Sequence, residues 1–279
     1  GWSSGKLTKT ALQEPRLSVV VPTWNEEENI DAVLMALAVG AKCSIEILLS
    51  DGESSDNTVQ RAKALLQSEQ WPKSAALKIA QGPKGRGKQL NRGAQAATGD
   101  ILLFVHADTR LPSGFGKQVL ALLDTPGVLC GAFAFGVDVG RLGTTIASKP
   151  KGKGQVVDVG MQEDGRFFIW QMRALEFGTN LRAKHLELPY GDQALFCTTQ
   201  TFRSMGGFTD QPLLEDVDFV RRVRTKGHVA LLTDAAITSA RRWRRSGWVL
   251  NTGFNQVILL GYAAGVPPDT LAEWYYRRR

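Results

Sequence analysis

The chain has 279 residues, of which 43% are hydrophobic and 22% are charged. This length and balance exclude an intrinsically disordered chain and fit one large α/β domain or two small ones. The formal net charge of +7 favours an anionic partner, which can be a nucleotide diphosphate, a nucleic acid or an anionic membrane surface.

Cysteine usage and hydropathy restrict the compartment. Cys43, Cys130 and Cys197 are widely spaced and form no CxxC pair, so we expect buried thiols in a reducing compartment. No apolar run reaches the ~18 residues that predict a transmembrane helix. We therefore expect a cytoplasmic protein, either free or peripheral at a membrane. Because the first residue is Gly rather than Met, removal of a targeting segment stays an open alternative.

Strands and helices are predicted to alternate through the first part of the chain, after a polar tail at residues 1–16. Short apolar runs predict buried strands, and apolar residues at helical spacing predict the helices between them. The strands are expected at residues 17–21, 45–49, 77–80 and 101–105, and the helices at 26–39, 58–66 and from the Gly-rich loop 82–87 to residue 97. This alternation predicts a parallel sheet whose ligands bind at the carboxyl ends of its strands.

The second half of the chain is less regular. A strand is expected at residues 128–137, and helices at 168–177, 214–225 and 248–262. Between them, residues 140–165 are rich in Gly and Lys, which predicts an exposed insertion.

Polar residues follow the ends of the first two predicted strands. Trp24 can stack on a nucleobase while its neighbours Pro22, Thr23 and Glu26 bond to a ribose, or it can belong to the core. Asp51, at the tip of the second strand, can accept a hydrogen bond from a base or ribose, or can stabilise a capped turn.

A candidate site for phosphate and metal follows the next two strands. Arg86 and Lys88 can neutralise phosphates, and Asp108, at the end of the 101–105 strand, is a natural ligand for Mg²⁺ or Mn²⁺. His106 is either a second metal ligand, a group that supports the ligands, or a structural residue.

Two adjacent acids, Glu215 and Asp216, begin the 214–225 helix. Neighbouring side chains on a helix point about 100° apart, so the pair cannot act as a dyad. One acid can face a cleft as a general base while the other is held by hydrogen bonds.

Five short segments follow one another along the chain. They are V-P-T-W-N-E-E, S-D-G-E-S-S-D-N-T, the DxD-like H-A-D, G-G-F and E-D, at residues 21–27, 50–58, 106–108, 206–208 and 215–216. In this order they resemble the family 2 glycosyltransferases, which have the GT-A fold, and the resemblance covers residues 17–275. H-A-D-T at residues 106–109, Y-G-D-Q at residues 190–193 and S-A-R-R-W at residues 239–243 further resemble a subgroup of short, soluble bacterial enzymes.

The resemblance implies a single large α/β domain with a Rossmann-like, mostly parallel sheet flanked by helices. It implies an inverting enzyme that moves a sugar from a nucleotide-diphosphate sugar to a hydroxyl-bearing acceptor, which is a lipid, a glycan or a small molecule. Asp216 is then the catalytic base beside Glu215, and Asp108 with His106 holds Mn²⁺ or Mg²⁺. The nucleotide site is assigned to Pro22, Thr23, Trp24, Glu26, Asp51, Arg86 and Lys88, and the acceptor or diphosphate site to Asp192, Gln193, Arg242 and Trp243.

The same resemblance divides the chain by role. Residues 17–130 form the nucleotide-sugar-binding half, residues 131–240 the acceptor-binding half with the insertion at 140–165, and residues 241–279 a basic amphipathic helical region. His106 replaces the first DxD carboxylate, which weakens the expected metal affinity. The Arg-Arg-Trp segment only partly matches the Q-x-x-R-W motif of processive synthases, so one sugar is expected per event.

Two other functions stay open. Residues 82–88 fit the GxxxxGK pattern of a P-loop nucleotide hydrolase, although Gln89 replaces the expected Ser or Thr. A non-catalytic protein that binds sugar nucleotides or a membrane surface through its Arg clusters is the second alternative. No nucleic-acid motif accompanies the charge, so no nucleic-acid partner is expected. The basic residues 241–245 before an apolar helix instead suggest peripheral membrane contact, with packing of that helix on the sheet as the alternative.

Overall fold

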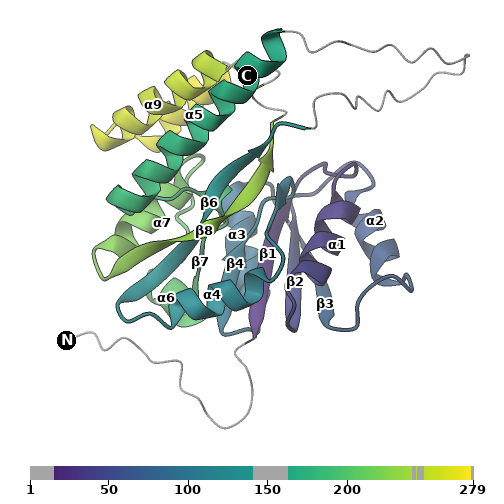
Figure 1. Ribbon diagram of the computed structural model, residues 1–279. Helices are drawn as coiled ribbons and strands as arrows, with labels where there is room; N and C mark the ends of the chain where they lie inside the picture. Colours follow the sequence, from purple (N-terminus) through teal and green to yellow (C-terminus); the bar gives the residue numbers. More distant parts are fainter. Residues whose placement is uncertain (1–15, 141–162, 241–242, 244–247, 278–279) are drawn as a thin grey trace, which may run out of the picture.

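The computed structural model describes residues 16–140, 163–240, 243 and 248–277, which form a mixed α/β fold around one eight-stranded sheet (Figure 1). The strand order is β3-β2-β1-β4-β7-β6-β8-β5. The strands are β1 (Leu17–Thr23), β2 (Ile45–Asp51), β3 (Ala75–Gln81), β4 (Ile101–Phe104), β5 (Thr109–Arg110), β6 (Val128–Asp138), β7 (Phe196–Thr198) and β8 (His228–Ser239).

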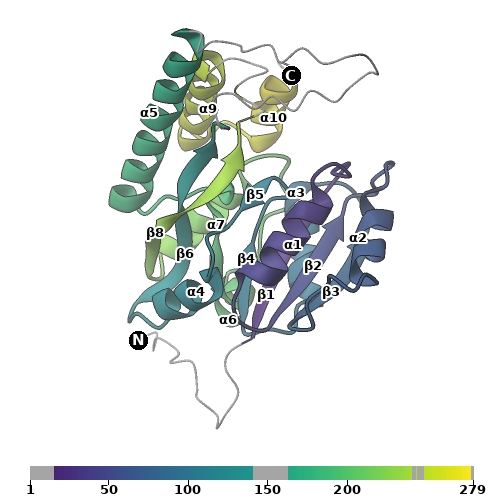
Figure 2. The ribbon, with the colours of Figure 1, turned by 45° about the vertical axis from the view of Figure 1, so that its right-hand side comes forward.

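Helices lie on both faces of this sheet, and a further group covers one end of it (Figure 2). α5, α9 and α10 make up that group, beside the long strands β6 and β8. The helices are α1 (Ile30–Gly40), α2 (Thr58–Leu66), α3 (Arg86–Ala96), α4 (Phe115–Leu123), α5 (Glu163–Leu186), α6 (Thr199–Ser204), α7 (Glu215–Arg224), α9 (Trp248–Ala263) and α10 (Pro268–Arg277), with a 3-10 turn, η1 (Gly191–Gln193).

The central strands are hydrophobic because both of their faces are covered. Val19 and Val21 of β1 belong to the core on the side of α1 and α4, whereas Val20 belongs to the core on the side of α3 and α7. β1, β2, β3 and β4 are parallel, so their carboxyl ends meet at one edge. The core therefore holds rigid the edge from which the candidate site is built.

The second half of the sheet is mixed rather than parallel. β7 is antiparallel to both β4 and β6, β6 and β8 are parallel, and β5 is antiparallel to β8. Cys130 and Cys197 face each other across the β6–β7 pair as buried free thiols, and Cys43 is a half-buried free thiol. Burial raises the pKa of Cys130 to about 12, which keeps this thiol protonated and unreactive.

Several element predictions need correction. α1 begins at Ile30 and not at residue 26, because residues 26–29 form a turn. α5 is much longer than the predicted 168–177 helix and begins at Glu163, so the last residues of the predicted insertion are helical. Residues 141–162, the rest of that insertion, lie outside the described residues. Elements that the sequence analysis did not predict are α4, α6, α10, β5, β7, β8 and η1.

The predicted C-terminal helix is present as α9, and it packs against α10. Ile258, one of the residues expected on its apolar face, is buried, and Phe254 stacks on Tyr275 of α10 with ring centroids 6.3 Å apart. In the part of the chain that the structure covers, no helix is both long and apolar enough to cross a bilayer.

Glu46 is a buried carboxylate that joins three strands at the amino-terminal edge of the sheet. It accepts hydrogen bonds from the Ser18 hydroxyl and from the backbone N–H groups of Thr98 and Gly99, and it pairs with Lys78 at 2.8 Å. Burial by itself raises its pKa, but Lys78 and these hydrogen bonds outweigh burial and lower the pKa to about 2.

We predict that Glu46→Gln lowers the free energy of unfolding by about 2 kcal/mol at pH 7. A lowered pKa in the folded state stabilises the fold above the ordinary pKa of 4.5, and this contribution is lost as the pH falls toward about 2. Urea unfolding at pH 7 and pH 3 measures it, with the exposed Glu28→Gln as the control. The gap between Glu46→Gln and wild type should shrink at pH 3; a gap independent of pH contradicts this account.

Candidate active site

The loops that follow β1 and β2 are joined by side-chain hydrogen bonds. Asn25 and Ser54 link the loops at their outer ends, with the Asn25 N–H donating to the Ser54 hydroxyl at 2.9 Å. Closer to α2, the Glu26 N–H donates to Thr58 at 2.8 Å, and the Glu27 N–H donates to Asp56 at 3.1 Å. The two predicted nucleotide-binding segments therefore form one continuous surface.

Asp51 lies at the carboxyl end of β2, as expected, but it is fully buried. Its carboxylate accepts from the Thr23 hydroxyl at 3.2 Å and from the Ser54 N–H at 2.9 Å. Direct contact between Asp51 and a nucleoside therefore requires Ser54 to move, and its nucleotide-binding role stays a prediction.

Gln89 and Arg92 hold this edge together, and the sequence analysis assigned neither of them a role here. The Gln89 amide donates to the carbonyl oxygens of Thr23 at 2.7 Å and Ser50 at 3.1 Å. Arg92 donates to the Asp51 carbonyl at 2.7 Å. Their spacing of three residues puts both on the same face of α3. This spacing predicts a contact with the sheet edge only when the position of α3 against β1 and β2 is known.

Trp24 lies on the surface beyond β1, with 45% of its area exposed. The Lys84 ammonium lies 3.0 Å from the centroid of its indole ring, a cation–π contact that keeps the ring standing out from the sheet. Pro22 is half-buried within β1, and Lys88 extends to Asp210 at 3.5 Å on the surface. These three residues are accessible or nearly so, and their predicted contacts with the nucleotide remain untested.

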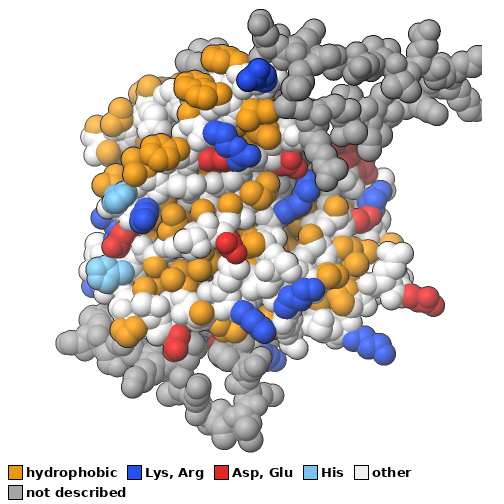
Figure 3. Space-filling model, viewed as in Figure 1, with side chains coloured by type: hydrophobic (Ala, Val, Ile, Leu, Met, Phe, Trp, Pro, Cys, Tyr) orange, Lys and Arg blue, Asp and Glu red, His pale blue; other side chains and the backbone are white. Residues whose placement is uncertain are grey.

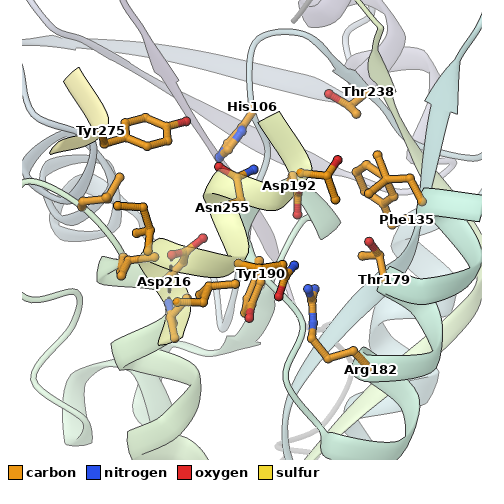
Figure 4. A pocket seen from close by; sticks show the side chains of 18 of the residues that line it. His106, Phe135, Thr179, Arg182, Tyr190, Asp192, Asp216, Thr238, Asn255 and Tyr275 are labelled. Carbon is orange, nitrogen blue, oxygen red and sulfur yellow. Dashed lines mark hydrogen bonds between the residues drawn. The ribbon is translucent and has the colours of Figure 1, made fainter. Parts of the chain in front are cut away.

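A cavity of about 180 Å³ opens where the sheet edge meets α5, α7, α9 and α10. Figure 4 shows His106, Asp192, Asp216 and Asn255 reaching it from different elements. Its polar lining is Arg86, His106, Asp108, Thr179, Arg182, Tyr190, Asp192, Asp216, Thr238, Ser239, Thr252, Asn255, Gln256 and Tyr275.

A second cavity of about 490 Å³ adjoins the first. Asp108, Thr238 and Ser239 line both cavities, and Asp138 and Arg110 line only the second. Asp108 therefore lies at the junction of two spaces, one on the side of α1 and one on the side of α7.

Arg86 bridges the two predicted catalytic acids. Its guanidinium pairs with Glu215, and its Nη2 lies 3.1 Å from an Asp216 carboxylate oxygen. The Arg86 side chain is 41% exposed, whereas both acids are buried. Asp216 also accepts from the backbone N–H groups of Gly191 at 2.7 Å and of Val217 at 2.8 Å.

These contacts shift the pKa values of the two acids in opposite directions. Burial raises the pKa of Glu215, and the charge of Asp216 raises it further against the opposing effect of Arg86. Burial also acts to raise the pKa of Asp216, but Arg86, the two backbone N–H groups and His106 together lower it. Divergent pKa values in adjacent acids are typical of sites that need an ionised base, and Asp216 is the one that stays ionised.

The glycosyl transferase family 2 model matches residues 18–180, more than half of the chain. The chain belongs to glycosyl transferase family 2. Its match to the probable glycosyltransferase YdaM of Bacillus subtilis is 24% identical over 263 residues, covering 90% of this chain and 57% of the relative. The glucosyl-3-phosphoglycerate synthase of Mycobacterium tuberculosis is 31% identical over 109 residues, covering 39% of this chain and 33% of the relative. The chain thus spans only part of the length of these relatives.

Solved structures of glycosyltransferases share the fold. The mannosyltransferase PcManGT of Pyrobaculum calidifontis, in complex with GDP-Man and Mn²⁺, aligns with a TM-score of 0.57 at 17% identity, covering 88% of this chain and 65% of that one. Glucosyl-3-phosphoglycerate synthase of Mycobacterium tuberculosis, in complex with Mn²⁺, UDP and phosphoglyceric acid, aligns at 0.54 and 17% identity, covering 96% and 84%. The predicted GT-A-type α/β fold is confirmed.

Within this family 2 chain, Asp108 and His106 provide few protein ligands for a metal. No group of three or more His, Cys, Asp or Glu side chains suited to a metal ion exists among residues 16–140, 163–240, 243 and 248–277. That donor set nevertheless fits Mg²⁺ or Mn²⁺ bound together with a diphosphate, because such ions use one or two carboxylates and take their other ligands from phosphates and water. Asp108 and Arg86 line the same cavity, which agrees with this arrangement.

The residues predicted to bind the acceptor or diphosphate differ in whether they line the first cavity. Asp192 and Trp243 line the first cavity, and Trp243 packs edge-on against Phe135. Gln193 is fully buried, and its amide donates to the Phe133 carbonyl at 3.2 Å. This contact fixes the η1 turn that carries Asp192, and the predicted ligand contact of Gln193 stays a prediction. Arg242 lies outside the described residues.

The loop that resembles a P-loop does not have the geometry of one. The Gly85 N–H donates to the Gln89 side chain at 3.2 Å, so it is not free to hold a phosphate. Lys88, which would reach the phosphates of a nucleotide, pairs with Asp210. Together with the family assignment, this removes the P-loop hydrolase as a working hypothesis.

Proposed function

We propose that this chain transfers one sugar from a nucleotide-diphosphate sugar to a hydroxyl-bearing acceptor, with inversion at the anomeric carbon and with Mn²⁺ or Mg²⁺. The observation that supports it best is a single cavity lined by Asp108, Arg86 and Asp216. Such a transfer needs a carboxylate for the metal, a cation for the phosphates and a base, and the side chains of Asp108, Arg86 and Asp216 have the chemistry for these three roles.

The donor would lie along the carboxyl edge of the parallel strands. Its base and ribose would contact Trp24 and Glu26, with Asp51 reached by a movement of Ser54, and its diphosphate would reach Arg86 and Asp108. Mn²⁺ or Mg²⁺ bound by Asp108 would neutralise the negative charge that develops on the diphosphate as it leaves. The relatives in complex with UDP or GDP-Man and with Mn²⁺ support this placement by family likeness.

Asp216 would act on the acceptor. Its carboxylate takes the proton of the acceptor hydroxyl while that oxygen bonds to the anomeric carbon and the bond from that carbon to the diphosphate oxygen breaks. A single displacement inverts the anomeric centre, so one base suffices. Arg86 contacts Asp216 in the structure; a diphosphate that attracts Arg86 would leave Asp216 free for the acceptor.

A panel of UDP-, GDP- and CDP-sugars tested by thermal shift with Mn²⁺ examines this proposal. One nucleotide class at about a hundred times its Kd should raise Tm by roughly 5–10 °C, because a ligand that binds only the folded state stabilises it. ATP serves as the control for the alternative hydrolase. Stabilisation by ATP without stabilisation by any sugar nucleotide contradicts the proposal.

We also propose peripheral membrane contact, but through α5 rather than through the residues before α9. Phe167, Trp170 and Phe177 are 60%, 62% and 70% exposed along one side of α5, and Leu181 continues the row at 48%. Figure 3 shows hydrophobic side chains gathered over the region of α5 and α9. Exposed bases on α5 flank this row, namely Arg166, Arg173 and Lys184.

The charge on this face favours an anionic bilayer. Between residues 166 and 186 the only acid is Glu176, which is partly buried and accepts from the Val137 N–H at 2.7 Å. Aromatic side chains with flanking bases are typical of helices that lie in the headgroup region.

We predict that the chain floats with phosphatidylglycerol vesicles at low salt and that Trp170→Ser with Phe177→Ser lowers the bound fraction at least about fivefold. Both side chains are exposed, so the fold should tolerate the change. Leu66→Ser, on the exposed surface of α2, is the control. Equal flotation of the double variant and wild type would exclude α5 as the contact.

A further inference from the structure

Arg182 is a cavity residue to which the mechanism above assigns no role. It comes from α5 and lines the first cavity together with Tyr190 and Asp192 of the η1 turn and its lead-in. Thr179, one helical turn earlier on α5, lines the same wall. Figure 4 shows the Arg182 guanidinium between Tyr190 and Thr179.

The guanidinium of Arg182 is held in place from two sides. Its Nε donates to the Leu188 carbonyl at 3.1 Å, and its central carbon lies 3.6 Å from the centroid of the Tyr190 ring. A planar guanidinium stacked on a ring and tethered at Nε keeps one orientation, so its remaining nitrogens point in a fixed direction.

One of those nitrogens, Nη2, is buried and has no hydrogen-bond acceptor among the described residues. No carboxylate in the described part of the chain lies within ion-pair distance of Arg182 either. A buried donor of a charged group without an acceptor destabilises the fold, so a fixed and unsatisfied guanidinium in a cavity wall indicates a missing ligand group.

We infer that Arg182 binds an anionic group, a phosphate or a carboxylate, of the acceptor. Such groups match a guanidinium through two parallel hydrogen bonds. The Thr179 hydroxyl and the Asn255 amide, both in the cavity lining, offer further donors. Asp216 repels an anion from the part of the cavity where the acceptor hydroxyl would react, which favours Arg182 as the place for it.

This inference rests on the proposed function and narrows it to acceptors that carry both a hydroxyl and an anionic group. The hydroxyl lies at Asp216 and the anionic group at Arg182. A neutral sugar hydroxyl can accept only an uncharged hydrogen bond from Arg182, which is weaker than the charge-assisted pair formed with an anion, so a neutral acceptor would bind more weakly.

The test uses the full chain saturated with Mn²⁺ and the nucleoside diphosphate that stabilises it best, so that phosphate cannot enter the donor site. Glycerol 3-phosphate is titrated by calorimetry against glycerol as the neutral counterpart, and phosphatidylglycerol in detergent micelles tests whether the anion belongs to a lipid. We expect glycerol 3-phosphate or the lipid to bind at least tenfold more tightly than its neutral counterpart, glycerol or diacylglycerol.

Arg182→Gln should abolish this preference, whereas Arg182→Lys should keep part of it through its charge. Arg203→Gln, an exposed base on α6 away from both the cavity and α5, should bind the probes like wild type. Binding of the nucleoside diphosphate to Arg182→Gln should be unchanged, which reports that the variant is folded. The inference fails if wild type binds the nucleoside diphosphate but shows no preference for either anionic probe. It also fails if Arg182→Gln retains the preference, and in both cases the proposed function stands. If no sugar nucleotide binds, the proposed function itself fails.

Discussion

Asp216→Asn is expected to lower the rate of sugar transfer at least about a hundredfold while leaving donor affinity near that of wild type. A positioned general base contributes roughly 10² to 10⁴ in rate, and the amide of Asn cannot accept the acceptor proton. The amide oxygen can still accept from the Gly191 N–H, which Asp216 holds at 2.7 Å, so the η1 turn should stay in place. Turnover at saturating donor, together with calorimetric donor binding, separates the chemical step from binding.

The neighbouring acids serve as matched controls for this variant. Asp218 bonds to Arg222 at 2.8 Å and to Thr209 at 3.2 Å, so Asp218→Asn should affect stability more than rate. Glu215 pairs with Arg86 and has a raised pKa, so Glu215→Gln should change the position of Arg86 and lower donor affinity. Near-normal turnover by Asp216→Asn with loss in either neighbour would move the base to that neighbour.

Asp108→Ala is expected to remove the metal-dependent part of donor binding. A divalent ion held by Asp108 would neutralise the diphosphate, and without this carboxylate the ion has too few protein ligands to stay in place. Wild type should bind a UDP- or GDP-sugar more tightly in Mn²⁺ than in EDTA, by at least about tenfold, and Asp108→Ala should bind it equally weakly in both.

Asp138→Ala is the matched control, since Asp138 lines the adjoining cavity and pairs with Arg110 at 3.0 Å. It should keep the dependence on Mn²⁺. Equal donor affinity of wild type in Mn²⁺ and EDTA would show that the nucleotide is held without a metal.

The first half of the fold could be predicted because each signal was local. The short apolar runs of β1 and β2 and the helical spacing of Val33 and Leu37 identify their elements without knowledge of the partners. Since parallel strands share one carboxyl edge, placing Asp51 and Asp108 near that edge needed only the strand ends.

The second half depends on contacts that the sequence does not show. β8 mixes buried, partly buried and exposed residues without alternation; it pairs with β6 from His228 to Ser239 with register shifts, and only Ile237 and Thr238 also pair with the short β5 on its other side. Arg182 could not be predicted as a binding residue, because this role depends on how α5 packs beside the η1 turn, which follows α5 after a short loop. The contact of Arg86 with Glu215 and Asp216 joins residues about 130 positions apart, and no local pattern could indicate it.

Release of nucleoside diphosphate from the best-binding sugar nucleotide, measured with a mixture of neutral and anionic hydroxyl acceptors, tests the proposed activity most directly. With Mn²⁺, wild type should release it with matching formation of a glycosylated product. Release should stop in EDTA, which removes the metal. It should also stop in Asp108→Ala, which lacks the carboxylate for the metal, and in Asp216→Asn, which lacks the base. Release at the wild-type rate in EDTA or by Asp216→Asn would contradict a metal-dependent transfer with Asp216 as its base.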